Sequence, residues 1–141
     1  MLIRAAVTRD AALPPTIEEL ELDAPRADEV LVRLVATGIC HTDLFAPRLF
    51  PLPGVFGHEG AGIVEQVGAH VGKLRPGDRV VLTFGSCGHC RNCLAAAPAY
   101  CEHGHRLQFG GTREDGRTTL SRAGERAHGS FLQQSSLATR A

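Results

Sequence analysis

The 141-residue sequence contains no tryptophan, one tyrosine and six phenylalanines, so large aromatic side chains form only a small part of its core. Lysine plus arginine equals aspartate plus glutamate at 15 each, which gives a formal net charge of zero. A chain without net charge has no long-range positive field to attract nucleic acid or an anionic membrane surface. We therefore expect neither of these as a partner.

Long apolar runs are also missing. No stretch approaches the roughly 20 apolar residues that cross a bilayer. The N-terminal stretch is interrupted by Arg4 and Arg9 and contains two prolines, so it lacks the continuous apolar region of a signal peptide. We expect a cytoplasmic protein. In that reducing compartment, clustered cysteines hold metal more often than they form disulfides.

Short strands separated by glycine and proline turns are the main pattern along the chain. The expected strands lie within 2–8, 16–22, 29–39, 61–68 and from Arg79 onward. A turn at Pro76-Gly77, in which the glycine supplies a positive φ, is expected just before the last of these. We interpret 44–56 as a proline-rich loop, 110–128 as a polar exposed loop, and 129–141 as ending in a strand. The length fits one domain. The sequence predicts a single, mainly β domain with a few short helical turns.

Four of the five cysteines fall within fifteen positions, in CGHCRNCLAAAPAYC. The gaps between them are two, two and seven residues, and two-residue gaps let neighbouring sulfurs converge on one ion. Gly88 and Asn92 lie in the gaps, where a tight backbone suits residues that tolerate a left-handed conformation. The pattern favours structural zinc, with an iron–sulfur cluster, two disulfides or unrelated buried thiols as alternatives. The ligands are Cys87, Cys90, Cys93 and Cys101.

Three histidines lie in or near this segment, namely His89, His103 and His105. Four sulfurs already complete a tetrahedral shell, so we interpret these histidines as solvated loop residues.

The fifth cysteine, Cys40, follows an expected strand in the run GICHTD. A solitary cysteine in that place is most often a small buried apolar residue. Here it stands beside an imidazole, a hydroxyl and a carboxylate, and GHEGAGIVEQVG follows 18 residues later with His58 and Glu59. Catalytic zinc takes three protein ligands and keeps one position open, and Cys40 and His58 would be two of the three.

These three motifs, in this order, resemble the N-terminal, GroES-like catalytic domain of zinc-dependent medium-chain alcohol dehydrogenases. The resemblance covers nearly the whole chain. The terminal QQSSLATRA and the APAYC stretch are most similar to the aryl-alcohol (benzyl alcohol) branch. The implied fold is a distorted GroES-like barrel spanning 1–141, with short helices and a zinc-binding loop lobe at about 85–110.

The resemblance also implies roles for individual residues. Cys40 and His58 would hold the catalytic zinc, with Glu59 as a nearby carboxylate. Thr42 would take the proton of the alcohol, and Asp43 would orient His58 through its other ring nitrogen. One further residue, His41, matches the position that meets the pyrophosphate of the cofactor.

The sequence departs from the family pattern in three places. Phe45 stands where many members have a histidine that passes the proton to solvent. No cysteine remains to act as the third ligand of the catalytic zinc. GAGIVE at 60–65 begins like a dinucleotide fingerprint, but Glu65 replaces the last glycine and no helix is expected after it. We therefore expect an N-terminal piece of a longer enzyme, inactive by itself and without the nucleotide-binding domain.

The function that the resemblance implies is oxidation of primary, aromatic alcohols to aldehydes with NAD, in a homo-oligomeric parent enzyme. Two alternatives remain open at this point. One is a stand-alone zinc-binding interaction module in which Cys40 and His58 are merely packed. The other is a medium-chain reductase that uses the same domain with NADP.

Overall fold

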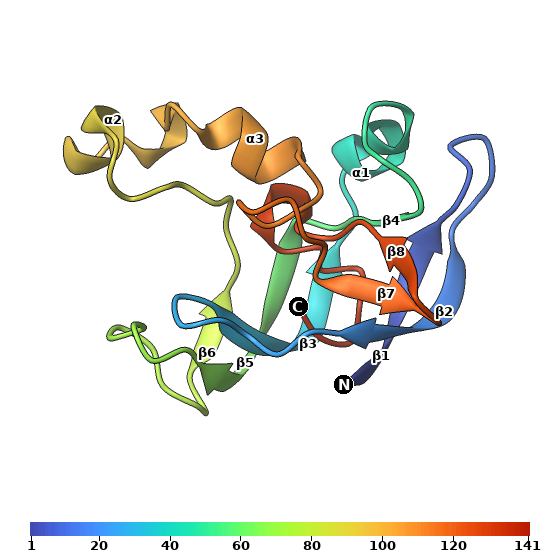
Figure 1. Cartoon of the computed structure of the whole chain (residues 1–141), viewed down its shortest axis with the longest axis horizontal. Coiled ribbons are helices and arrows are strands. Elements are labelled where there is room, and N and C mark those ends of the chain that lie inside the picture. Colours follow the sequence, from blue (N-terminus) through green and yellow to red (C-terminus); the bar gives the residue numbers. More distant parts are fainter.

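The computed structural model describes all 141 residues and contains eight strands in two antiparallel sheets (Figure 1). The five-stranded sheet has the order β4-β1-β2-β7-β8, and the three-stranded sheet has the order β3-β5-β6. The strands are β1 (Leu2–Thr8), β2 (Thr16–Leu22), β3 (Val30–Gly38), β4 (Gly54–Val55), β5 (Glu59–Val67), β6 (Arg79–Val81), β7 (Leu120–Arg122) and β8 (Glu125–Ala127). The predicted mainly β fold, a distorted barrel, is confirmed.

The helices are short, as predicted, and lie along one end of the sheets in Figure 1. The α-helices are α1 (His41–Phe45), α2 (Arg91–Leu94) and α3 (Gly104–Phe109). The 3₁₀-helices are η1 (Ala46–Arg48), η2 (Pro98–Tyr100) and η3 (Phe131–Gln133). No helix is long and apolar enough to span a membrane.

The main core lies on the inner face of the five-stranded sheet. In β1, Ile3, Ala5 and Val7 are buried while Leu2 and Arg4 point to solvent, as the two-residue period of a strand requires. They pack with Leu20, Leu22, Leu31, Val55, Leu120 and Ala127. A second cluster joins Ala46, Phe50, Phe56 and Phe131. In that cluster the three phenylalanine rings meet edge to face, with centroids 5.2 to 5.5 Å apart.

The C-terminal segment joins the two sheets instead of forming the expected regular strand. It first makes η3, and its last residues then run extended between β1 and β3. The amide of Ala6 donates to the carbonyl of Leu137 at 2.8 Å, and Val32 and Ala141 exchange two backbone hydrogen bonds at 2.7 and 3.0 Å. The sequence analysis was therefore right that 129–141 ends in an extended segment. This segment begins later than a strand over the whole stretch would, because the first half of 129–141 forms η3 and local turns.

Two expected loops contain regular structure. The segment 110–128 was expected to be an exposed loop, but it carries β7 and β8, which pair antiparallel around a turn at Ala123–Gly124. Within 44–56, η1 and β4 interrupt the proline-rich loop. Both elements are only two or three residues long, so they leave no periodic pattern in the sequence.

Three residues were expected to adopt a left-handed backbone in turns, and two of them, both glycines, do so. Gly77, before β6, has φ +97°, and Gly88, between the first two clustered cysteines, has φ +75°. Asn92 was expected to be left-handed, but it lies inside α2, and the left-handed residue that follows this helix is Ala96 with φ 59°. The turn after the third cysteine is thus made by alanine.

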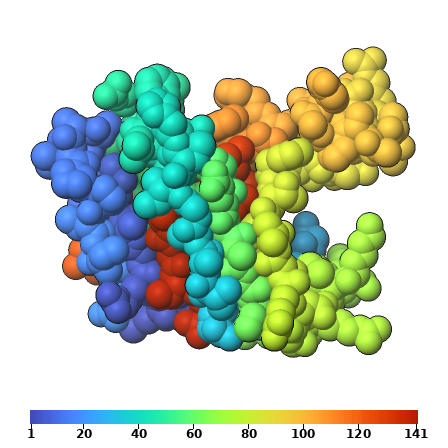
Figure 2. Space-filling view, turned by 180° about the vertical axis from the view of Figure 1, so that it is seen from behind, coloured from blue at the N-terminus to red at the C-terminus, as the bar shows by residue number.

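Residues 85–110 project from the sheets as a separate lobe, seen at the upper left in Figure 1 and the upper right in Figure 2. The lobe contains α2, η2 and α3. Only one of its four cysteines, Cys90, is buried, at 7% exposure. Its apolar core is correspondingly small, so side-chain packing alone contributes little to its order.

Candidate functional site

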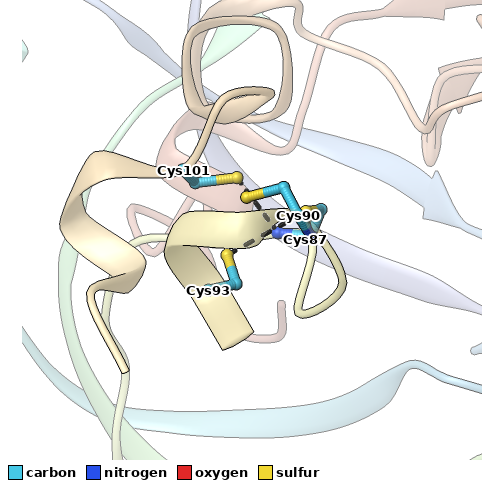
Figure 3. Close-up of side chains that lie close together, drawn as sticks. All are labelled: Cys87, Cys90, Cys93 and Cys101. Carbon is cyan, nitrogen blue, oxygen red and sulfur yellow. Dashed lines mark hydrogen bonds between the residues drawn. The ribbon is translucent and has the colours of Figure 1, made fainter. Parts of the chain in front are cut away.

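The four clustered cysteines turn their sulfurs toward one another (Figure 3). Their Sγ atoms all lie within 4.8 Å of each other, and those of Cys87 and Cys93 are 3.9 Å apart. A tetrahedron with Zn–S bonds of about 2.3 Å has edges of about 3.8 Å. A disulfide needs about 2.0 Å, and all five cysteines of the chain are free. The separation therefore fits four thiolates around one zinc ion. We call these four residues the quartet.

Backbone amides of the lobe point at the quartet sulfurs. The amide of Cys87 donates to Sγ of Cys101, and the amide of Cys90 donates to Sγ of Cys87, each at 3.3 Å. Such bonds stabilise the thiolate form that binds metal. The backbone amide of Cys93 lowers the pKa of Cys90, and the amide of Cys87 lowers that of Cys101, whereas burial raises the pKa of Cys93.

A second group of ligand atoms comes from the residue just before α1 and from the start of β5. Cys40 immediately precedes α1, while His58 and Glu59 lie at the start of β5. One ligand atom from each of the three lies within 4.8 Å of the other two. The set offers sulfur, imidazole nitrogen and carboxylate oxygen, all of which zinc accepts. We call it the Cys-His-Glu site. The structure thus brings Glu59, the nearby carboxylate of the sequence analysis, within reach of the other two ligand atoms.

Asp43 holds the two halves of this site together. Its Oδ2 accepts from the amide of Cys40 at 2.9 Å, and its Oδ1 accepts from the amide of Gly57 at 3.0 Å. The same Oδ1 lies 3.0 Å from Nδ1 of His58. A carboxylate accepts only, so this Nδ1 carries the hydrogen and Nε2 has the free lone pair.

The charges of the site favour metal binding by Cys40. The hydroxyl and amide of Thr42 lower the pKa of the Cys40 thiol, and the imidazole of His58 contributes in the same direction. Sγ of Cys40 is 3.4 Å from the Thr42 amide and 3.5 Å from its hydroxyl. Burial lowers the pKa of His58, but the hydrogen bond and charge of Asp43 outweigh it, so the pKa is raised overall.

Gly38 makes room for the third donor. A β-carbon at this position would collide with the carboxylate of Glu59, which lies opposite it in the β3–β5 pair. Only glycine leaves that space free. The sequence gives no sign of this, because the glycine reads as an ordinary strand end.

The C-terminal segment braces the same region from behind. The amide of Ser136 donates to the carbonyl of Gly57 at 3.0 Å, and the amide of Gly60 donates to the side chain of Gln134 at 3.3 Å. The Phe131 ring packs edge to face on His58, with centroids 5.7 Å apart. The sequence analysis missed these three residues, since they stand more than 70 positions from His58.

The remaining predicted residues lie around α1. His41 and Thr42 are both exposed in the first turn of this helix. Phe45, at its end, is 47% exposed, and Leu44 and Leu49 nearby are 68% and 80% exposed. Phe50 and Phe56 of the proline-rich segment instead lie in the core. Part of the proline-rich segment therefore forms apolar surface, and the rest packs into the core.

Comparison with known proteins agrees with this geometry. The model of the alcohol dehydrogenase GroES-like domain matches residues 26–133, which is most of the chain. The chain belongs to the alcohol dehydrogenase GroES-like domain family. This family was the one predicted from the motifs, and its GroES-like fold is that of the two sheets described above.

Individual relatives give the same result. The chain is 48% identical to geraniol dehydrogenase of Castellaniella defragrans over 141 residues, covering 98% of this chain and 38% of that protein. An alcohol dehydrogenase zinc-binding domain protein of Burkholderia ambifaria superposes with a TM-score of 0.96 at 51% identity, covering 99% of this chain and 39% of the other. Benzyl alcohol dehydrogenase of Acinetobacter calcoaceticus gives a TM-score of 0.93 at 41% identity, with coverage of 99% and 38%. The chain thus spans well under half the length of these relatives.

Proposed function

We propose that residues 1–141 form the catalytic domain of a zinc-dependent alcohol dehydrogenase that oxidises primary alcohols to aldehydes with NAD. The observation that carries the proposal is the convergence of Cys40, His58 and Glu59 beside the buried Asp43, in a chain of this family. The parent enzyme is proposed to be cytoplasmic and homo-oligomeric, as the family resemblance implies.

In this proposal the quartet is a structural zinc site and the Cys-His-Glu site is the catalytic one. The quartet offers four thiolates and no open position, so it orders the lobe at 85–110 by coupling metal binding to folding. The Cys-His-Glu site has three donors and leaves a fourth position for the substrate. Zinc bound there supplies Lewis acidity to the alcohol oxygen and favours loss of its proton.

The chain's own residues orient and deprotonate the alcohol. Asp43 fixes the tautomer and the ring position of His58. The exposed hydroxyl of Thr42, 3.5 Å from Sγ of Cys40, is the group proposed to accept the alcohol proton while it passes its own hydroxyl proton to solvent. His41, exposed on the same helix, is proposed to contact the cofactor pyrophosphate. A nicotinamide bound by the parent enzyme would supply the acceptor for the hydride of the alcohol carbon.

Apolar surface near α1 supports an apolar substrate. Leu44, Phe45 and Leu49 are all exposed beside the site. Relatives of this chain are named for geraniol and for benzyl alcohol, which share an apolar body and a primary hydroxyl. We propose that aromatic alcohols are the preferred substrates.

A chimaera tests the catalytic role. The 141 residues replace the aligned residues of the C. defragrans geraniol dehydrogenase, and NADH formation is measured with benzyl alcohol, geraniol and ethanol. We expect turnover with the first two, and none from the 141-residue chain alone. Cys40→Ser should abolish turnover, while Val35→Ala, exposed on β3, should not.

The same assay separates the alternatives. No turnover from a folded chimaera with Cys40 intact would favour the zinc-binding interaction module. An unaltered rate in the Cys40→Ser chimaera would instead overturn the proposed role of Cys40. Reduction of NADP instead of NAD would tell little about this domain, since the chimaera's nucleotide site comes from the other protein. The direct test of cofactor choice is therefore the parent enzyme of this chain, assayed with each nucleotide in turn.

A further inference from the structure

Two histidines that neither proposed zinc site uses lie beside the quartet. One ligand atom from each of Cys87, His89 and His103 lies within 4.8 Å of the others. His89 precedes α2 and His103 directly precedes α3, so two separate segments of the lobe bring them together. Their ring centroids are 5.7 Å apart with an interplanar angle of 34°. The sequence analysis had interpreted both as solvated loop residues.

A hydrogen bond to the backbone holds the ring of His89 and sets its tautomer. Its Nδ1 lies 2.8 Å from the backbone carbonyl of Cys87. A carbonyl can only accept a hydrogen bond, so Nδ1 is the protonated nitrogen and Nε2 keeps its lone pair. Histidine ligands of metal ions commonly donate their other nitrogen to a carbonyl in this way.

Charge and access also favour a cation here. Four thiolates and one divalent zinc leave two negative charges on the quartet. The guanidinium of Arg91 is paired with Glu102 at 2.6 Å, so it is not available to neutralise them. Both histidines are exposed, and Cys87 and His89 line a recess of about 780 Å³ that opens beside the lobe (Figure 2). An ion from solvent can reach these three side chains directly.

We propose that Cys87, His89 and His103 form a second zinc site on the lobe, which shares the Cys87 sulfur with the quartet. A thiolate sulfur has enough lone pairs to bridge two ions. Three protein ligands leave the fourth position of this ion to water. Tetrahedral sites with one sulfur and two nitrogens have donor separations of about 3.3 to 3.6 Å, so the side chains need to close by about 1.5 Å at most. The shared sulfur gives zinc a route from solvent into the closed quartet.

Cadmium-113 NMR on the full 141-residue chain tests this proposal, because the chemical shift distinguishes four-sulfur from mixed sulfur and nitrogen ligation. With excess ¹¹³Cd²⁺ we expect a four-sulfur signal and a second signal from one sulfur and two nitrogens. The two should show cadmium–cadmium coupling through the shared Cys87 sulfur. A third signal from the Cys-His-Glu site is recognised because Cys40→Ser removes it.

Substitution of the two histidines is the decisive comparison. In the His89→Ala/His103→Ala chain the coupled second signal should vanish while the four-sulfur signal stays. His105→Ala, in the same lobe but outside the set, should keep both. Each single histidine substitution should weaken binding of the second zinc by more than about tenfold and leave the first unchanged.

The outcomes for the two lobe sites are distinct. A coupled second signal that survives in the double variant, or a wild-type chain without one at saturating cadmium, overturns the second site. Absence of the four-sulfur signal in the wild type instead overturns the quartet, which belongs to the proposed function.

Discussion

Oδ1 of Asp43 lies 3.0 Å from Nδ1 of His58, although 15 residues separate the two in the chain. The Asp43 side chain is only 2% exposed, and its two oxygens also accept the amides of Cys40 and Gly57. A single buried carboxylate therefore fixes the backbone that carries the sulfur and the ring that carries the nitrogen. Asp43 thus ties the Cys40 and His58 parts of the Cys-His-Glu site to each other.

Replacing Asp43 by asparagine should weaken the Cys-His-Glu site. The amide keeps the size of the side chain but loses the charge that raises the pKa of His58, so that pKa should fall. Zinc affinity at this site should drop about 10- to 100-fold, as for other residues that orient a ligand. Competition with a chelator and an NMR pH titration of His58 measure the two effects.

The matched control is Asp78→Asn. Asp78 also accepts a backbone amide, that of Arg75 at 2.8 Å, but in an exposed turn before β6. It should leave both zinc affinities unchanged. Equal affinities in the Asp43→Asn chain and the wild type would contradict the positioning role.

Gly38→Ala should act on the same site through Glu59. The added methyl group would meet the carboxylate, which must then move away from Cys40 and His58. Zinc binding at the Cys-His-Glu site should weaken, while the quartet stays loaded. Isothermal titration of the apo chain with zinc measures both sites.

A double-mutant cycle shows whether the effect passes through Glu59. In a Glu59→Gln background the carboxylate charge is already gone, so Gly38→Ala should weaken binding much less than in the wild type. Fully additive losses would show that the alanine instead disturbs the β3–β5 pair.

Loss of the quartet ion should unfold the lobe and spare the sheets. The lobe buries little apolar surface, so we expect an ion in the quartet to supply the order that packing does not. In Cys93→Ser, amide hydrogen exchange should become fast across 85–110 and remain slow in β1 and β2. Cys40→Ser should leave exchange in the lobe as in the wild type. Uniformly fast exchange in the Cys93→Ser chain would show that the lobe and the sheets unfold together.

The sequence predicted the parts of this molecule that depend on local chemistry. Clustered cysteines with two-residue gaps converge because a short turn suffices, and the turn glycines at 77 and 88 adopt the expected backbone. The longer strands were predicted because their sequences alternate at least in part, as Ile3, Ala5 and Val7 of β1 and Leu20 and Leu22 of β2 show by facing the core.

Other features depend on contacts between distant segments and left no local pattern. Gln134 and Ser136 brace the Gly57–Gly60 segment from the far end of the chain. Similarly, β7 and β8 are three residues each and form because β2 offers an edge to pair with. His89 and His103 meet only because α2 and α3 fold around the quartet.

The last prediction concerns Glu18, whose carboxylate ties three parts of the five-stranded sheet. On β2, it accepts from Arg9 beyond β1 at 2.8 and 2.9 Å and from Arg122 of β7 at 2.6 Å. The hydrogen bond from Arg9 is the main reason that the pKa of Glu18 falls to about 2 from 4.5. The folded form therefore binds this proton less tightly than the unfolded form.

It follows that Glu18 stabilises the fold above pH 4.5 and that this contribution is lost as the pH falls from 4.5 toward about 2. Glu18→Gln should lower the free energy of unfolding by about 1 kcal/mol at pH 7, because partly exposed ion pairs are screened by solvent. The difference from the wild type should shrink through that acid window in urea titrations. Glu19→Gln, on the exposed face of β2, should change little at any pH. A difference that stays constant down to pH 2 would show that Glu18 acts through its shape and not its charge.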